Sequence, residues 1–139
     1  GLQAATLRSS APGAPAWCAY VDVDYFKSIN DRRGHDHGDD VLQAVADSLS
    51  AAGGELTARW GGDEFVTLGY GETPTGEAIQ ERVERGIRVI EPRAGVSVGM
   101  ASGQLRDGDD LTGLIGEADR KMYERRAIAR GEAPPGGPR

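Results

Sequence analysis

The chain has 139 residues, of which 38% are hydrophobic and 27% charged, enough for one domain with a core and too few for two. Its net charge of −6 argues against a broad nucleic-acid surface, and no apolar run approaches the roughly 20 residues that cross a bilayer. No signal peptide is evident and Cys18 has no cysteine partner, so we expect a cytoplasmic protein with a buried thiol.

Hydrophobic periodicity and turn residues predict eight elements between a leader or linker over 1–15 and a disordered tail over 131–139. In chain order they are a strand over 17–23, a helix over 25–31, a helix from Asp36, strands over 55–60 and 64–69, a helix over 75–90 capped at Thr73-Pro74, a strand over 94–101 and a helix capped by Asp109 or Asp110. The order β-α-α-β-β-α-β-α is typical of an α/β (α+β) fold with ferredoxin-like connections. We expect one domain over 16–130, with a mostly antiparallel sheet and helices against one face or both.

A pair of glycines separates the two middle strands. Gly61-Gly62 predicts a two-residue hairpin, because tight hairpin turns need positive φ, which glycine adopts without strain. Asp63 and Glu64 follow the pair at once. Exposed carboxylates at a hairpin tip are suited to a divalent cation, provided that another acid meets them in space.

Asp22 is the candidate for that other acid. It lies in an apolar strand pattern, where a carboxylate is costly to bury unless it is paired or bound to a cation. Close to Asp63, it would complete a pair of carboxylates from separate elements, suited to one or two Mg²⁺ ions together with phosphate oxygens. The alternative is a structural acid paired with a lysine or arginine.

The polar residues after this strand are suited to a nucleotide. Lys27, with the backbone N–H groups of a tight strand-to-helix turn, is suited to phosphate oxygens. Asn30 and Asp39 can read a purine edge, and an aspartate accepts two hydrogen bonds from guanine that adenine cannot match. Capping and turn roles remain an alternative for both residues. His37 is expected to face solvent.

Four motifs follow one another in the order, and near the spacing, of one known family. They are D-V-D-Y-F-K-S-I-N-D over 22–31 with G-H at 34–35 and G-D at 38–39, R-W-G-G-D-E-F over 59–65, G-V-S-V-G over 95–99 and A-D-R-K-M-Y over 118–123. On these motifs, the chain resembles the GGDEF family of diguanylate cyclases, which condense two GTP molecules into cyclic di-GMP. The resemblance implies a palm-type, nucleotidyl-cyclase-like sheet.

The resemblance also implies roles for individual residues. Asp63 and Glu64 are implied to be catalytic, Glu64 as a second metal ligand or by assisting deprotonation of the ribose 3′-hydroxyl. The implied ligands of Mg²⁺, or Mn²⁺, are Asp22, Asp63, Glu64 and the carbonyl of Val23. The implied substrate-binding residues are Asn30 and Asp39 at the guanine, Tyr25, Phe26 and Lys27 at the β- and γ-phosphates, Gly61 and Gly62 in the turn, and Arg126 and Arg130 at the triphosphate. A solvated helix face is the alternative for the two arginines.

The implied reaction needs more than one copy of the chain. A homodimer is implied, because one domain holds one GTP and two sites must face each other, and we expect an upstream sensory or dimerisation domain. Ala52 and Glu55 occupy the ends of the family's R-x-x-D inhibition motif, so no inhibitory site of that type is expected. Two alternatives stay open: a non-catalytic GTP-binding regulatory module and another GTP-consuming enzyme on the same scaffold.

Overall fold

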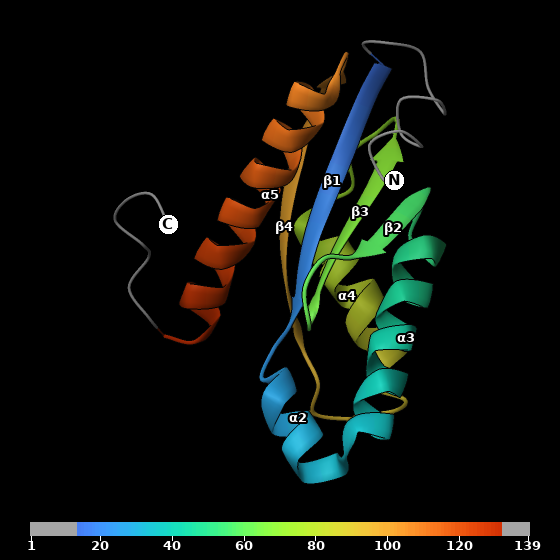
Figure 1. Cartoon of the computed structure of the whole chain (residues 1–139), viewed down its shortest axis with the longest axis vertical. Helices are drawn as coiled ribbons and strands as arrows, with labels where there is room; N and C mark the ends of the chain where they lie inside the picture. The colour runs from blue at the N-terminus through green and yellow to red at the C-terminus, as the bar shows by residue number, and fades with distance from the viewer. Residues whose placement is uncertain (1–13, 132–139) are drawn as a thin grey trace.

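Four strands and four helices follow one another in the predicted order in the computed structural model, which describes residues 14–131 (Figure 1). The predictions for 1–13 and 132–139 lie outside the described residues. The elements are β1 (Ala14–Val23), α2 (Phe26–Arg33), α3 (His35–Ala51), β2 (Leu56–Arg59), β3 (Glu64–Tyr70), α4 (Gly76–Ile87), β4 (Val96–Leu105) and α5 (Gly108–Ala129). No helix of this described part is both long enough and apolar enough to cross a membrane.

The four strands form one sheet in the order β2-β3-β1-β4, in which every neighbouring pair is antiparallel. Helix α5 covers one face of the sheet, and α3 and α4 cover the other (Figure 1). The predicted antiparallel sheet with flanking helices is therefore confirmed, and β1 is central.

Alternation along β1 sends its side chains to two separate cores. Val21 and Val23 are buried on the side of α3 and α4, whereas Cys18 and Tyr20 are buried on the side of α5. Asp22 shares the face of Tyr20 and is only 2% exposed. The strand therefore places one carboxylate under the end of α5, directly beside an apolar core.

Helix α5 approaches β4 very closely at Gly99. A Cβ atom at this position would overlap the backbone carbonyl oxygen of Ala118 and the backbone nitrogen of Met122. Only glycine leaves room for this contact, which places the last turns of α5 over the end of β1. The side chain of Arg126 thereby reaches the buried acid.

Two helix caps differ from the prediction. The hydroxyl of Thr75 caps α4 by accepting a backbone hydrogen bond at 3.1 Å, so the predicted Thr73-Pro74 cap is wrong. The carboxylate of Asp107 caps α5 by accepting the N–H of Asp110 at 3.0 Å, so neither Asp109 nor Asp110 is the N-cap. In both cases several residues suited to capping are adjacent, and composition does not distinguish between them.

The two longest strands extend beyond their predicted ends. Strand β1 begins at Ala14 and β4 continues to Leu105, and these two residues are paired in register. Pro15 and Gly103 are poor strand formers, which is why the local pattern ended earlier. Pairing between the strands overrides the local preference.

The hairpin between β2 and β3 is wider than predicted. The loop runs over 60–63, and neither Gly61 nor Gly62 has positive φ. The N–H groups of Trp60 and Gly61 donate to the carbonyl of Glu64 at 2.7 and 3.3 Å, which closes the loop without a two-residue turn. The prediction of a two-residue turn is therefore wrong, although the hairpin itself is present.

Cys18 offers a test of the core beneath α5. The thiol is fully buried, and burial raises the pKa of Cys18 to about 12. Because the thiolate is the reacting form, we expect Cys18 to resist alkylation at about pH 8 in the folded chain and to react promptly in denaturant. Mass spectrometry of the labelled chain measures both rates. Fast labelling of the native chain would show that this core opens readily.

A candidate metal and nucleotide site

Three carboxylates meet where β1 ends and the β2–β3 hairpin turns. Asp22 lies at the end of β1, Asp63 ends the loop and Glu64 begins β3. One carboxylate oxygen from each lies within 4.8 Å of the others. Asp22 is opposite Glu64 in the sheet register, and the N–H of Val23 donates to the carbonyl of Asp63 at 3.0 Å. The backbone thus fixes the positions of all three acids that the sequence singled out.

Asp22 is the buried member of this cluster. Burial and then the nearby Asp63 raise the pKa of Asp22 to about 7, although Arg126 favours the ionised form. Its Oδ2 accepts a hydrogen bond from Nη1 of Arg126 at 3.0 Å, whereas Oδ1 is buried without a hydrogen-bond partner among the described residues. An unpartnered buried carboxylate oxygen costs free energy that a bound cation offsets. The all-oxygen donor set therefore fits a hard divalent cation such as Mg²⁺.

Tyr20 is a member of the site that the sequence analysis missed. Its hydroxyl donates to Oε1 of Glu64 at 3.0 Å and holds that half-buried carboxylate beside the cluster. The signal was available, because Tyr20 and Asp22 are two positions apart on one strand and must share a face.

Arg59 supports the loop that carries Asp63. Its Nε donates to the carbonyls of Gly61 and Gly62 at 3.2 and 3.1 Å, and its Nη2 donates to Gly62 at 2.6 Å. A Cβ on Gly61 would come within 3.1 Å of Oε1 of Glu64, so this glycine leaves space for the carboxylate. At Gly62 a Cβ would meet nothing within 4 Å.

The start of α2 presents free backbone N–H groups. Tyr25, the N-cap, is in the left-handed region with φ of 55°, its side chain makes no capping bond, and the first turn contains no acid. An uncapped helix N-terminus is suited to an anion such as phosphate. Phe26 points into the core and offers only its backbone, whereas the side chain of Lys27 is exposed.

The end of α5 brings both predicted arginines to this place. The guanidinium of Arg126 pairs with Asp22 and lies 5.0 Å from the centre of the Tyr123 ring. Arg130, one turn later, lies 4.8 Å from the centre of the Tyr25 ring. Arg126 is thus a half-buried part of the acid cluster rather than part of a solvated face, and Arg130 lies at the start of α2.

The two predicted guanine-reading residues lie on neighbouring helices. Asp39 is exposed on α3 beyond its first turn, and the N-cap of α3 is Gly34, so Asp39 has no capping role. It lines a hollow of about 600 Å³ between α3 and the β2–β3 hairpin. Asn30 lies at the contact between α2 and α3, where its Oδ1 is buried without a hydrogen-bond partner in the part of the chain described.

Three further contacts link segments around the site that are distant in the sequence. The hydroxyl of Ser97 donates to Oδ1 of Asp24 at 2.8 Å, and burial raises the pKa of Asp24. The prediction that His37 faces solvent is wrong. Its Nε2 lies 3.2 Å from Oε1 of the buried Glu91, and Nη1 of Arg33 lies 3.7 Å from the same oxygen. No local signal predicts this contact, since 54 residues separate His37 from Glu91.

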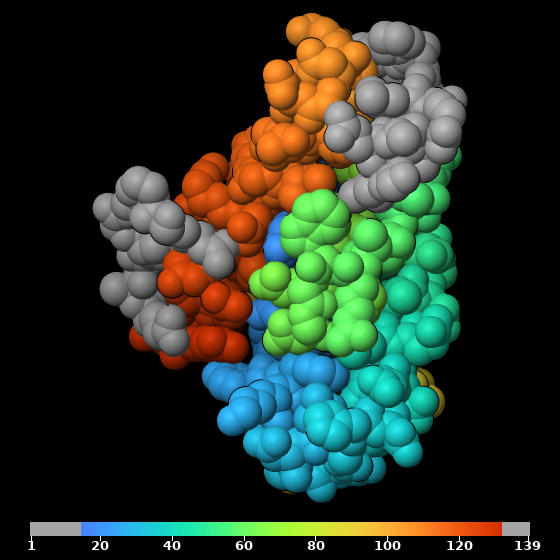
Figure 2. Space-filling view, viewed as in Figure 1, coloured from blue at the N-terminus to red at the C-terminus, as the bar shows by residue number. Residues whose placement is uncertain are grey.

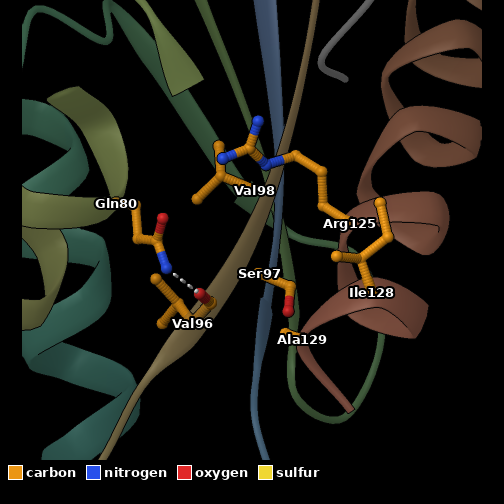
Figure 3. Close-up of a pocket in the computed structure, with 7 residues that line it drawn as sticks. All are labelled: Gln80, Val96, Ser97, Val98, Arg125, Ile128 and Ala129. Atoms are coloured by element: carbon orange, nitrogen blue, oxygen red, sulfur yellow. Dashed lines mark hydrogen bonds between the residues drawn. The ribbon is translucent and has the colours of Figure 1, made fainter. Parts of the chain in front are cut away.

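The surface around the cluster is hollowed. Figure 2 shows residues of β1 at the floor of a gap between α5 and the β2–β3 hairpin, beside the start of α2. A separate cavity of about 320 Å³ lies between α4 and α5 against β4 (Figure 3). Its lining has one charged residue, Arg125, and none of the three clustered acids, so it is not the site of the predicted chemistry.

Known proteins are similar to this chain in sequence. The family described as "Diguanylate cyclase, GGDEF domain" matches residues 2–132. Diguanylate cyclase VdcA of Vibrio cholerae is 31% identical over 127 residues, which cover 83% of this chain and 37% of VdcA. The chain therefore spans little more than a third of the length of that relative.

Solved structures agree with the sequence match. The active GGEEF domain of a diguanylate cyclase from Vibrio cholerae is 29% identical, with a TM-score of 0.60 over 92% of this chain and 82% of that one. Diguanylate cyclase SiaD of Pseudomonas aeruginosa, solved in complex with its activator SiaC, is 28% identical, with a TM-score of 0.63 over 91% of this chain and 51% of that one. The chain belongs to the GGDEF-domain family of diguanylate cyclases.

Proposed function

We propose that this chain is a diguanylate cyclase, which joins two GTP molecules into cyclic di-GMP through attack of each ribose 3′-hydroxyl on the α-phosphate of the other nucleotide. The observation that carries the proposal is the cluster of Asp22, Asp63 and Glu64 around a buried carboxylate oxygen that has no hydrogen-bond partner among the described residues. Arg126 and Tyr20 contact two of these acids, but three carboxylates so close together repel one another, and a bound cation would offset that repulsion.

Mg²⁺ is the proposed cofactor, with Mn²⁺ as a substitute. Asp22, Asp63 and Glu64 would hold it together with the carbonyl of Val23, and when bound it would neutralise phosphate charge and favour ionisation of the 3′-hydroxyl. Glu64 completes the metal site or accepts the hydroxyl proton, and the hydrogen bond from Tyr20 holds its carboxylate for either role.

The nucleotide is proposed to lie across the start of α2. The free N–H groups after Tyr25 bind the β- and γ-phosphates, Lys27 and Arg130 supply positive charge from both sides, and Arg126 lies between the acid cluster and the phosphates. Gly61 and Gly62 form the wall beside the acids. Asn30 and Asp39 hold the guanine, and the carboxylate of Asp39 accepts hydrogen bonds from its N1 and N2, which distinguish it from adenine.

The active form is proposed to be a homodimer. The described residues form one such cluster, and joining two GTP molecules at both ends needs two sites that face each other. We propose that an upstream sensory or dimerisation domain brings two copies together. We place the reaction in the cytoplasm, where GTP is available.

Incubation of the chain with GTP and Mg²⁺, followed by mass analysis of the products, tests the proposal. We expect cyclic di-GMP and pyrophosphate, with a rate per chain that rises with protein concentration because dimers form by mass action. Bound but unchanged GTP at high concentration would instead indicate the regulatory module, and any other guanine product would indicate a different enzyme on this scaffold.

A further inference from the structure

The corner between α2 and α3 is closed by two glycines with different functions. Gly34 has φ of 90°, and its N–H donates to the carbonyl of Asn30 at 2.8 Å, which ends α2. The N–H of Gly38 then donates to the carbonyl of Gly34 at 3.1 Å in the first turns of α3. The chain therefore folds back so that Gly38 faces the side chain of Asn30.

Gly38 is buried and has no space for a side chain. A Cβ at this position would overlap Oδ1 of Asn30, and would lie 2.9 Å from its Cγ and 3.1 Å from Cζ of Phe26. The amide of Asn30 thus occupies the volume that any other residue at position 38 would fill. Oδ1 is buried and accepts no hydrogen bond from the described residues, so packing and not a hydrogen bond within them holds it in this place.

Glycine at this position is unfavourable for the helix. It is the poorest helix former after proline, and Gly38 lies inside the 17-residue helix α3 rather than at its end. By contrast, a Cβ on Gly113, an exposed residue of α5, would meet nothing within 4 Å. What sets Gly38 apart is therefore its contact with Asn30 and Phe26, not helix geometry.

We infer that Gly38 is a positioning residue for guanine recognition: it leaves the space in which the Asn30 amide lies, one residue before Asp39. This inference rests on the proposed function, in which both side chains hold the base. A methyl group at position 38 would push the amide out of its place. Its other close neighbour is Cζ of the Phe26 ring, and none of its three nearest atoms belongs to the acid cluster or to the backbone at the start of α2.

The test is binding of a non-hydrolysable GTP analogue with Mg²⁺ to the Gly38→Ala chain, measured by calorimetry. We expect affinity to fall about tenfold or more, the equivalent of about one hydrogen bond to the base. Binding of inorganic triphosphate with Mg²⁺ should change by less than about twofold, because this ligand has no base for the Asn30 amide to contact. The Gly113→Ala chain is the matched control and should bind both ligands like the wild type.

A double-variant cycle identifies the residue through which Gly38 acts. In an Asn30→Ala background, which removes both Oδ1 and Cγ, Gly38→Ala should cost little further affinity for the GTP analogue. Adding Asn30→Ala should also restore thermal stability that the Gly38→Ala chain loses, because it removes the atoms that the new methyl group overlaps. Even if the Gly38→Ala chain folds poorly, this restored stability measures the energetic coupling between positions 30 and 38.

The outcomes separate this inference from the proposed function. Equal loss of GTP analogue and triphosphate binding, or full additivity of the two substitutions, would overturn the positioning role while leaving the proposed function intact. A wild-type chain that binds triphosphate but binds the GTP analogue no more tightly than the matching ATP analogue would overturn both the positioning role and the proposed function.

Discussion

Replacing Asp63 by asparagine is expected to lower the rate of cyclic di-GMP formation by about a thousandfold or more. A lost metal ligand removes several kcal/mol of transition-state stabilisation, and each 1.4 kcal/mol is a factor of ten in rate. The amide is similar in size to the carboxylate and the side chain is half-buried on a loop, so the fold should be retained. Product formation from GTP and Mg²⁺ measures the rate, and Mn²⁺ binding measures the metal site independently.

The matched control is Asp40→Asn, which makes the same change of charge at an exposed position of α3. It should leave both the rate and Mn²⁺ binding close to wild type, since exposed charges away from the site contribute little. Full turnover by the Asp63→Asn chain would contradict the assignment of Asp63 to the metal.

The second large effect concerns stability rather than rate. We expect Asp22→Asn to abolish Mn²⁺ binding and yet to stabilise the metal-free protein at about pH 8, by on the order of 2 kcal/mol. Asparagine keeps an oxygen that can accept the hydrogen bond from Arg126, but it removes the negative charge that is buried beside Asp63. The wild-type residue would then be retained for binding at the expense of stability.

The sign of this expected change in stability follows from the protonation states of Asp22. Burial and the neighbouring Asp63 raise its pKa from 3.8 to about 7, so the folded chain holds this proton more tightly than the unfolded chain does. This tighter binding of the proton contributes stability to the folded wild-type chain. The contribution is fully present below about pH 4 and is lost as the pH rises to about 7. The difference in unfolding free energy between Asp22→Asn and wild type should therefore grow from about pH 5 to about pH 8.

Urea unfolding in the presence of a chelator measures this difference at both pH values. Addition of Mg²⁺ at about pH 8 should narrow it, because only the wild-type chain gains stability from the bound ion. A variant that is less stable than wild type at both pH values would show that the ion pair with Arg126 outweighs the cost of burying the charge.

The order of elements, and the three acids that meet in the cluster, could be predicted because short-range patterns mark the strands and the turn that carry them. Apolar spacing along α3 and α4 and the alternation of β1 follow from 3.6- and 2-residue periods. Asp22, Asp63 and Glu64 lie at the ends of strands that such patterns locate. The resemblance of the surrounding motifs to one family added the nucleotide-binding roles.

Other features could not be predicted because they depend on particular contacts that turn composition and apolar spacing do not report. The two-residue turn was inferred from Gly61-Gly62, yet hydrogen bonds from Trp60 and Gly61 to Glu64 and the support of Arg59 hold a longer loop. His37 was expected in solvent, yet Glu91 lies beside it. The contacts of the hairpin are local but are not determined by the glycine pair, whereas Glu91 is 54 residues away from His37.

The sequence by itself thus determined the sheet, the helices and the identity of the acids in the Gly-Gly-Asp-Glu-Phe hairpin and at the end of β1. Only the tertiary structure decided the chemical state of that cluster. Asp22 is separated from Arg126 by 104 residues, and it is their contact, together with burial and the approach of Asp63, that determines the pKa of Asp22. Charge and desolvation depend on distance in space, whereas a sequence pattern reports only distance along the chain.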